Sequence, residues 1–219
     1  MSETRSPRAI PVPDAIRRSP LFAVNGGFGV YDGLPDSATF DLLFAEARAC
    51  YQSATVQEST EPDREDIRGG KPRRKLLASS AGPAQDAMYA SESLRGILSA
   101  TCGLPIMPSG NRGSYSYYAR PGDFLDLHRD VETCDVAMIT ALYDNSLPAA
   151  NGGALVVYPG RVGEPLSAIR ARPREGARLV KLAPGQTIIL FGGVLPHCVL
   201  PVGDGQVRMV SVLCFRALM

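Results

Sequence analysis

The amino-acid sequence predicts a mainly β fold with α-helices: a double-stranded β-helix, or jelly roll, flanked by N-terminal helices. From Gly113 onward, short apolar segments are separated by Gly, Pro, Asp and Asn, a spacing typical of an all-β sandwich or barrel. Because no helical interval separates these segments, a jelly roll is favoured over a parallel α/β sheet. The eight predicted strands are 114–119, 123–129, 134–143, 153–158, 177–183, 186–191, 196–202 and 206–216.

The chain length and composition are those of a globular protein. Its 219 residues, 45% of them hydrophobic, can bury a substantial core without disulfides or a structural metal. We expect one domain over residues 1–219. Within it, residues 1–112 form helical and strand support with a variable region, and residues 113–219 form the jelly-roll core.

The N-terminal half begins with a polar segment. Residues 1–20 contain several prolines and predict a loose lead-in. Leu21–Tyr31 predicts one or two short strands around two glycines. Asp36 or Ser37 can cap a helix that continues to about Tyr51, because its apolar residues recur at helical spacing.

Two further features of this half concern a loop and a second helix. Residues 54–74 are charged and contain Pro and Gly, which predicts a mobile loop. A helix is expected to start after Pro83, to continue through Leu98 and to stop at Gly103. In the C-terminal half, residues 161–176 form an irregular insert between strands.

Charge and hydropathy exclude several classes of protein. A net charge of +1 argues against a general nucleic-acid-binding protein, which concentrates positive charge on one surface. No apolar run approaches the roughly 20 residues of a membrane span, so no membrane partner is expected. The first 20 residues lack the apolar core of a signal peptide, which predicts a cytoplasmic protein.

The cysteines indicate neither a zinc site nor a redox motif. The five residues are widely separated and form no CxxC pair. Reduced thiols are therefore the expectation for a cytosolic chain. The cysteines are Cys50, Cys102, Cys134, Cys198 and Cys214.

The two histidines of the chain both lie in the predicted β half. His128 and Asp130 stand two positions apart in FLDLHRD, so on a strand their side chains share one face, about 7 Å apart along the chain. His197 begins another predicted strand. Two imidazoles and one carboxylate on one side of a metal leave positions open, which suits iron(II) that binds a co-substrate and oxygen.

Arg208 is the candidate anion-binding residue. It lies 11 residues after His197 on the last predicted strand, among apolar neighbours, so its guanidinium is expected to point into the barrel. A buried guanidinium needs an anion and pairs best with a carboxylate through two hydrogen bonds. An internal salt bridge to Asp or Glu is the alternative.

Several segments together resemble one known enzyme family. YYARPGDFLDLHRD, ITALYDN, NGGALVVYPG, LVKLAPGQTIILFGG and PHCVLPVGDGQVRMVSVLCF are similar to the prolyl-4-hydroxylase-like branch of the iron(II)/2-oxoglutarate dioxygenase superfamily. The resemblance covers roughly residues 114–216. It includes the His-x-Asp pair, the distal histidine and the arginine at the expected distance.

The resemblance implies the cofactors and the residues that hold them. His128, Asp130 and His197 would be the catalytic ligands of Fe(II), and Arg208 would bind the C5 carboxylate of the co-substrate 2-oxoglutarate, with O2 as the second co-substrate. Because related halogenases lack the carboxylate, the presence of Asp130 disfavours halogenation. Ser211 has the opposite strand parity to Arg208 and is not assigned a role.

The family often adds a tyrosine hydroxyl that contacts 2-oxoglutarate. Tyr115, Tyr117 and Tyr118 are all available in this sequence, although the usual spacing would place the tyrosine at Ala119. Tyr117 or Tyr118 is the expected contact. A packing role in the strand is the alternative for all three tyrosines.

The expected reaction is hydroxylation or desaturation of an unactivated C–H bond in a small molecule, such as an amino acid or a natural-product intermediate. The alternatives are a protein or peptide prolyl hydroxylase and a non-enzymatic, cupin-like metal-binding protein. The basic stretch Arg68–Lys75 could close over the site and receive an anionic substrate, or it could be a solvated loop. The insert 161–176 could border the pocket.

Overall fold

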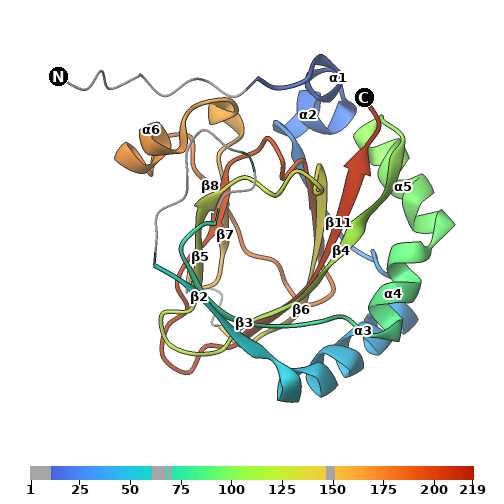
Figure 1. Cartoon of the computed structure of the whole chain (residues 1–219), viewed down its shortest axis with the longest axis vertical. Coiled ribbons are helices and arrows are strands. Elements are labelled where there is room, and N and C mark those ends of the chain that lie inside the picture. Colours follow the sequence, from blue (N-terminus) through green and yellow to red (C-terminus); the bar gives the residue numbers. More distant parts are fainter. Residues whose placement is uncertain (1–10, 61–67, 69–70, 147–150) are drawn as a thin grey trace.

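The structure is a computed structural model that describes residues 11–60, 68, 71–146 and 151–219. In this part of the chain the strands form one antiparallel sheet that curls around a central space (Figure 1). The predicted jelly roll with N-terminal helices is confirmed. The strands are β1 (Phe28–Tyr31), β2 (Thr55–Ser59), β3 (Arg74–Ser79), β4 (Ile106–Tyr118), β5 (Phe124–His128), β6 (Val136–Asp144), β7 (Leu155–Val157), β8 (Arg178–Val180), β9 (Thr187–Leu190), β10 (His197–Val199) and β11 (Arg208–Ala217).

The strand order divides the sheet into two halves that face each other. One half has the order β1-β9-β6-β11-β4, and the other has the order β5-β10-β7-β8. Strand β3 joins the halves because it pairs with both β4 and β5, while β2 extends from β3 as a hairpin partner. Side chains that alternate along strands of both halves therefore meet in the interior.

The longer helices cover the outer face of β4, β6 and β11, and a short helix lies at the other end of the molecule, near β8 (Figure 1). In this arrangement the helices pack against the outer face of the sheet and leave its inner face uncovered by helices. The helices are α1 (Asp14–Arg17), α2 (Pro20–Asn25), α3 (Ser37–Cys50), α4 (Pro83–Ala90), α5 (Glu92–Cys102) and α6 (Leu166–Ala171), with 3-10 turns at Tyr51–Ser53 and Pro159–Arg161.

The eight strands predicted in the C-terminal half are all present as β4 to β11. Two details differ from the prediction. Strand β4 begins at Ile106, before Gly113, and helix α6 lies between β7 and β8, so the strands do have one helical interval. The insert 161–176 thus contains a helix, with Leu166 and Ile169 buried against the sheet.

Of the one or two short strands predicted over Leu21–Tyr31, one is present. Residues 28–31 form β1, whereas the part of the segment before the two glycines belongs to α2. The Ser19 hydroxyl accepts a hydrogen bond from the Phe22 N–H at 3.2 Å, and Pro20 occupies the first helical position. Gly26 ends the helix with φ +72°, a conformation that glycine adopts without strain. Capping therefore decides the structure of a segment too short to show periodicity.

The two predicted helices are present, but the second is divided. Asp36 caps α3 by accepting the Thr39 N–H at 2.8 Å. The expected helix after Pro83 stops at Ala90, and Ser91 then caps α5 by accepting the Leu94 N–H. A serine hydroxyl competes for backbone groups, which explains the break within an otherwise helical segment.

The prediction of a mobile loop over residues 54–74 is partly wrong, because residues 55–59 form β2 and pair with β3. Residues 61–67 and 69–70 of that segment, and residues 1–10 of the predicted lead-in, lie outside the described residues. Within the described ranges, no helix is both long and apolar enough to cross a bilayer.

The expectation that all thiols are reduced is also contradicted. Cys134 and Cys214 form a disulfide with their Cα atoms 4.9 Å apart. They are 80 residues apart in the sequence, and they meet because β11 pairs with β6 directly after Cys134. Only this long-range pairing brings the two sulfurs together.

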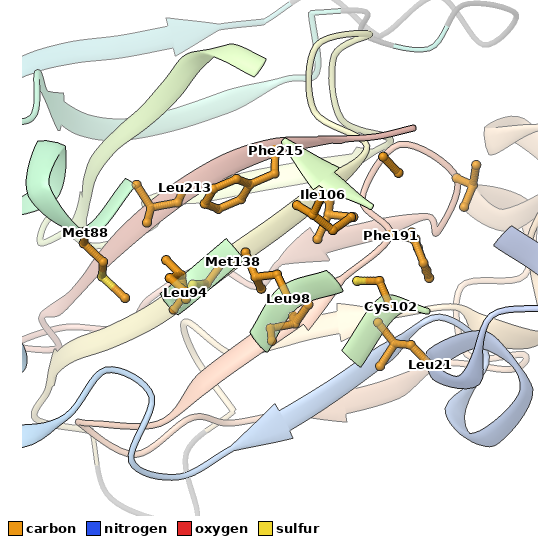
Figure 2. Close-up of a cluster of buried hydrophobic side chains, with 14 of the residues drawn as sticks. Leu21, Met88, Leu94, Leu98, Cys102, Ile106, Met138, Phe191, Leu213 and Phe215 are labelled. Atoms are coloured by element: carbon orange, nitrogen blue, oxygen red, sulfur yellow. The ribbon is translucent and has the colours of Figure 1, made fainter. Parts of the chain in front are cut away.

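The larger core lies between the helices and the sheet (Figure 2). Leu94 and Leu98 of α5 face Met138 of β6 and Phe215 of β11 across this layer. Each of these residues is at least 95% buried, and burial of a large apolar side chain stabilises the fold by roughly 1.5–3 kcal/mol. The packed layer holds β11 and β6 rigid on the side that faces away from the interior.

Candidate metal centre

The two histidines lie opposite each other on neighbouring strands. His128 ends β5 and His197 begins β10, and these strands pair with His197 in register with His128. Their ring centroids are 4.2 Å apart. The pairing explains how residues 69 positions apart come to share one site.

Asp130 completes the cluster from the loop that follows β5. Its Oδ1 atom lies 3.4 Å from His128 Nε2 and 3.6 Å from His197 Nε2. The ligand atoms of all three residues lie within 4.8 Å of one another. The Asp130 N–H donates to the Gly192 carbonyl at 2.8 Å, so the carboxylate is held by the backbone although Asp130 is not itself on the strand.

Both imidazoles are oriented by a backbone carbonyl two residues earlier in the chain. His128 Nδ1 lies 2.8 Å from the Asp126 carbonyl, and His197 Nδ1 lies 2.9 Å from the Leu195 carbonyl. A carbonyl can only accept, so the proton of each neutral ring resides on Nδ1. The Nε2 lone pairs then point toward the centre of the cluster, as in histidines that ligate metals.

Burial and mutual charge govern the protonation of the cluster. Burial and the neighbouring His197 lower the pKa of His128, which keeps that imidazole neutral. Burial also acts to lower the pKa of His197, but the Asp130 carboxylate outweighs it and raises that pKa. Burial acts to raise the pKa of Asp130, yet the two imidazoles hold it far below its usual range. The carboxylate is therefore ionised.

The chemistry of this donor set fits a divalent transition metal. Within the described part of the chain, Asp130 Oδ2 is a buried carboxylate oxygen without a hydrogen-bond partner. An uncompensated buried carboxylate oxygen is costly, and a cation among the three ligands would compensate it. Two imidazoles with one carboxylate form the set that non-haem iron(II) enzymes use.

Gly192 makes room for the carboxylate. A Cβ atom at Gly192 would overlap Asp130 Oδ2 and Cγ. A Cβ atom at the adjacent Gly193 would likewise overlap the Arg68 guanidinium. The sequence signal for this close approach is the FGG segment five residues before His197, whose role sequence reasoning did not recognise.

Replacing Gly192 with Ala is expected to displace the Asp130 carboxylate and to weaken iron(II) binding roughly 10- to 100-fold, the range seen when support around a metal ligand is removed. Gly160→Ala is the matched control, because a Cβ there meets nothing within 4 Å. Anaerobic iron(II) titration of both variants measures the effect. Equal iron(II) affinity in Gly192→Ala and wild type would contradict it.

Arg68 holds the loop that carries Asp130. Its guanidinium donates to the Asp130 carbonyl at 3.3 Å and to the Cys134 carbonyl at 2.7 Å. It also forms an ion pair with Asp135 at 2.7 Å. Within Arg68–Lys75, which was expected to receive an anion or to be solvated, this residue instead has a structural role. Residues 69–70 of that stretch lie outside the described residues.

Arg208 begins β11 and points into the interior, with only 3% of its surface exposed. Its guanidinium carbon lies 5.4 Å from the centre of the Tyr118 ring. Asp144 is its neighbour across the sheet, but that carboxylate pairs with Lys181 at 2.8 Å. Within the described residues, the Arg208 guanidinium has no ion pair, so the internal salt-bridge alternative is not observed.

The tyrosines of β4 divide between the two faces of the sheet. Tyr118 lines the interior beside Arg208. The Tyr117 hydroxyl instead donates to the Ala47 carbonyl at 2.8 Å, and the Tyr115 hydroxyl donates to Glu46 at 2.6 Å. Tyr117 therefore packs against the helices, and the expectation that it contacts a co-substrate is not supported. Successive side chains of a strand point to opposite faces, so Tyr117 points away from the cavity that Tyr118 lines.

The metal cluster and Arg208 open into one cavity of about 440 Å³ between the two halves of the sheet. This volume lies within the roughly 300–1,000 Å³ typical of small-molecule sites. Both apolar and polar residues line this cavity. The apolar residues include Leu125, Ile139, Leu155 and Val199, and the polar residues include Thr55, Gln57, Ser114 and Ser116.

Solved structures with this fold include several oxygenases. A prolyl-4-hydroxylase from Pseudomonas putida is 20% identical, with a TM-score of 0.59 over 91% of this chain and 96% of that chain. A Trichoplax adhaerens prolyl hydroxylase, in complex with a hypoxia inducible factor peptide fragment, is 17% identical, with a TM-score of 0.61 over 89% and 85%. The epimerase SnoN, in complex with Fe3+, alpha ketoglutarate and nogalamycin RO, is 13% identical, with a TM-score of 0.59 over 86% and 78%.

These likenesses establish that the chain shares the fold of the iron(II)/2-oxoglutarate oxygenases, including prolyl-4-hydroxylases, in agreement with the resemblance seen in the sequence. No protein-family model matches the chain, and no curated protein matches its sequence.

Proposed function

We propose that this chain is an iron(II)/2-oxoglutarate-dependent oxygenase that hydroxylates or desaturates an unactivated C–H bond of a small molecule. The observation that carries the proposal is the cluster of His128, Asp130 and His197, in which a buried carboxylate oxygen has no partner among the described residues. The shared fold and the buried Arg208 in the same cavity support it.

Each residue has a defined role in this proposal. His128, Asp130 and His197 hold iron(II), and the Asp126 and Leu195 carbonyls keep the imidazoles oriented. Bound iron with 2-oxoglutarate and O2 supplies the oxidising power for C–H cleavage.

Arg208 is the residue proposed to hold the co-substrate 2-oxoglutarate. The Arg208 guanidinium would bind the C5 carboxylate of 2-oxoglutarate, because its planar fork suits a carboxylate. Tyr118, packed against that guanidinium, limits the positions the co-substrate can take. The apolar residues that line the cavity would help to exclude water from the reacting atoms.

A small-molecule substrate is favoured over a peptide because the metal cluster opens into a cavity between the two sheet halves. Among the structures that share the fold, SnoN is in complex with the small molecule nogalamycin RO, whereas the Trichoplax enzyme is in complex with a peptide. A peptide substrate is therefore the competing outcome of a substrate screen.

The proposal is tested by anaerobic titration of the metal-free protein with iron(II) and then 2-oxoglutarate. A metal-to-ligand charge-transfer band is expected when both are present, with succinate released from 2-oxoglutarate once air is admitted. A wild-type protein that shows neither the band nor succinate would exclude this function and leave a non-enzymatic metal-binding protein as the alternative.

A further inference from the structure

Three consecutive basic residues at the start of β3 have different surroundings. Arg73 forms an ion pair with Asp126 at 2.8 Å, and Lys75 donates to the Pro121 carbonyl at 3.3 Å. The side chains of both residues therefore already bind groups of the protein. Arg74, between them, lines the cavity that contains the metal cluster.

Among the described residues, the Arg74 guanidinium has no counter-charge. Among the described residues its one hydrogen bond is the long contact from Nε to the Pro72 carbonyl at 3.4 Å, and no carboxylate lies within ion-pair distance. Arg74 is partly exposed, while Arg208 is buried. The cavity therefore has one guanidinium deep inside and a second that still reaches water.

The charges of the proposed complex balance without Arg74. Among the described residues that line the cavity, Asp130 carries the one carboxylate, and Arg74 and Arg208 carry the two guanidinium groups. With the cofactors of the proposed function bound, iron(II) and Arg208 together neutralise Asp130 and both carboxylates of 2-oxoglutarate. Arg74 would remain as an unmatched positive charge in a confined site, which favours an anionic partner.

We propose that Arg74 binds a carboxylate of the substrate, and that the enzyme acts on small organic acids. The inference rests on the proposed function and specifies its substrate class. A guanidinium fork matches a carboxylate through two hydrogen bonds. Thr55 and Gln57 of β2 are in register with Ala78 and Leu76 of β3, so they place further polar groups on the same wall as Arg74.

The test compares acids with their neutral amides on the anaerobic complex of the protein with iron(II) and 2-oxoglutarate. The probes are butanoate, phenylacetate and N-acetyl-leucine, each beside its primary amide. Binding is measured as a change in the charge-transfer band, and turnover as succinate released in air. The acids are expected to bind at least about 10-fold more tightly than the amides, as for a charge-assisted hydrogen bond.

Arg74→Gln is expected to weaken binding of the acids by about 10- to 100-fold and to remove their advantage over the amides. Lys75→Gln is the matched control, because it removes the same charge from the adjacent residue, which binds the Pro121 carbonyl. The control should leave both the preference and the affinity unchanged. Titration with 2-oxoglutarate alone should give the same affinity in both variants as in wild type.

Three results would overturn the inference: no preference for acids in wild type, equal losses in the two variants, or a loss confined to 2-oxoglutarate affinity in Arg74→Gln. The last would assign Arg74 to the co-substrate. Failure of the proposed function itself is seen earlier, as absence of the band before any acid is added, and the inference would fall with it.

Discussion

Replacing His197 with Ala is expected to lower iron(II) affinity by more than about 100-fold, beyond the 10- to 100-fold loss typical of residues that merely support a ligand. One of the two buried imidazoles is lost, and His128 and Asp130 alone cannot hold the metal in a defined geometry. Succinate formation from 2-oxoglutarate should fall to background. The measurements are anaerobic iron(II) titration and a succinate assay at saturating 2-oxoglutarate.

Cys198→Ala is the control for this variant. Cys198 is the next residue on β10, and it packs against the buried cluster that contains Leu127 and Tyr158 and is not among the residues that line the cavity. Its iron(II) affinity should match wild type, and near-equal melting temperatures of the two variants would exclude a folding defect. Wild-type turnover in a folded His197→Ala protein would refute the proposed metal centre.

Replacing Arg208 with Met is expected to weaken 2-oxoglutarate binding by roughly 100-fold while leaving iron(II) affinity unchanged. The substitution removes the buried guanidinium that the described residues leave without an ion pair, but it retains an apolar side chain of similar length. Arg208→Lys should be intermediate, because an ammonium keeps the charge and loses the two-point contact. The measurement is the 2-oxoglutarate dependence of the charge-transfer band.

Arg216→Met tests whether the effect depends on position. Arg216 lies on the same strand but is exposed at its far end, so its loss should not change 2-oxoglutarate affinity. Equal affinity in Arg208→Met and wild type would show that the co-substrate is anchored elsewhere. Arg74 would then be the first residue to examine, since its guanidinium also lines the cavity.

The sequence by itself was sufficient to predict the jelly roll and the residues at its centre. Apolar segments between turn residues located all eight C-terminal strands, because strand patterning is a local property. His128, Asp130, His197 and Arg208 were also identified as candidate site residues from the sequence, since few other side chains bind a metal or a buried anion. Helix caps at Asp36 and Gly103 were also visible as short motifs.

The tertiary structure alone decided which of these residues meet and what surrounds them. The register of His197 with His128, the approach of Gly192 to Asp130 and the disulfide between Cys134 and Cys214 all join residues more than 60 positions apart. Local propensity carries no information on such pairings. They follow from the order in which the strands of the curled sheet pair.

The same reason explains why the roles of individual side chains needed the structure. Tyr117 and Tyr118 are equivalent in composition and propensity, and only the face of β4 that turns inward distinguishes them. Arg68, Arg73, Arg74 and Lys75 are one basic stretch in the sequence. In the folded chain two of these guanidinium groups form ion pairs with Asp135 and Asp126, and the Arg74 guanidinium faces the cavity. The direction of a side chain depends on strand pairing, which the sequence does not display.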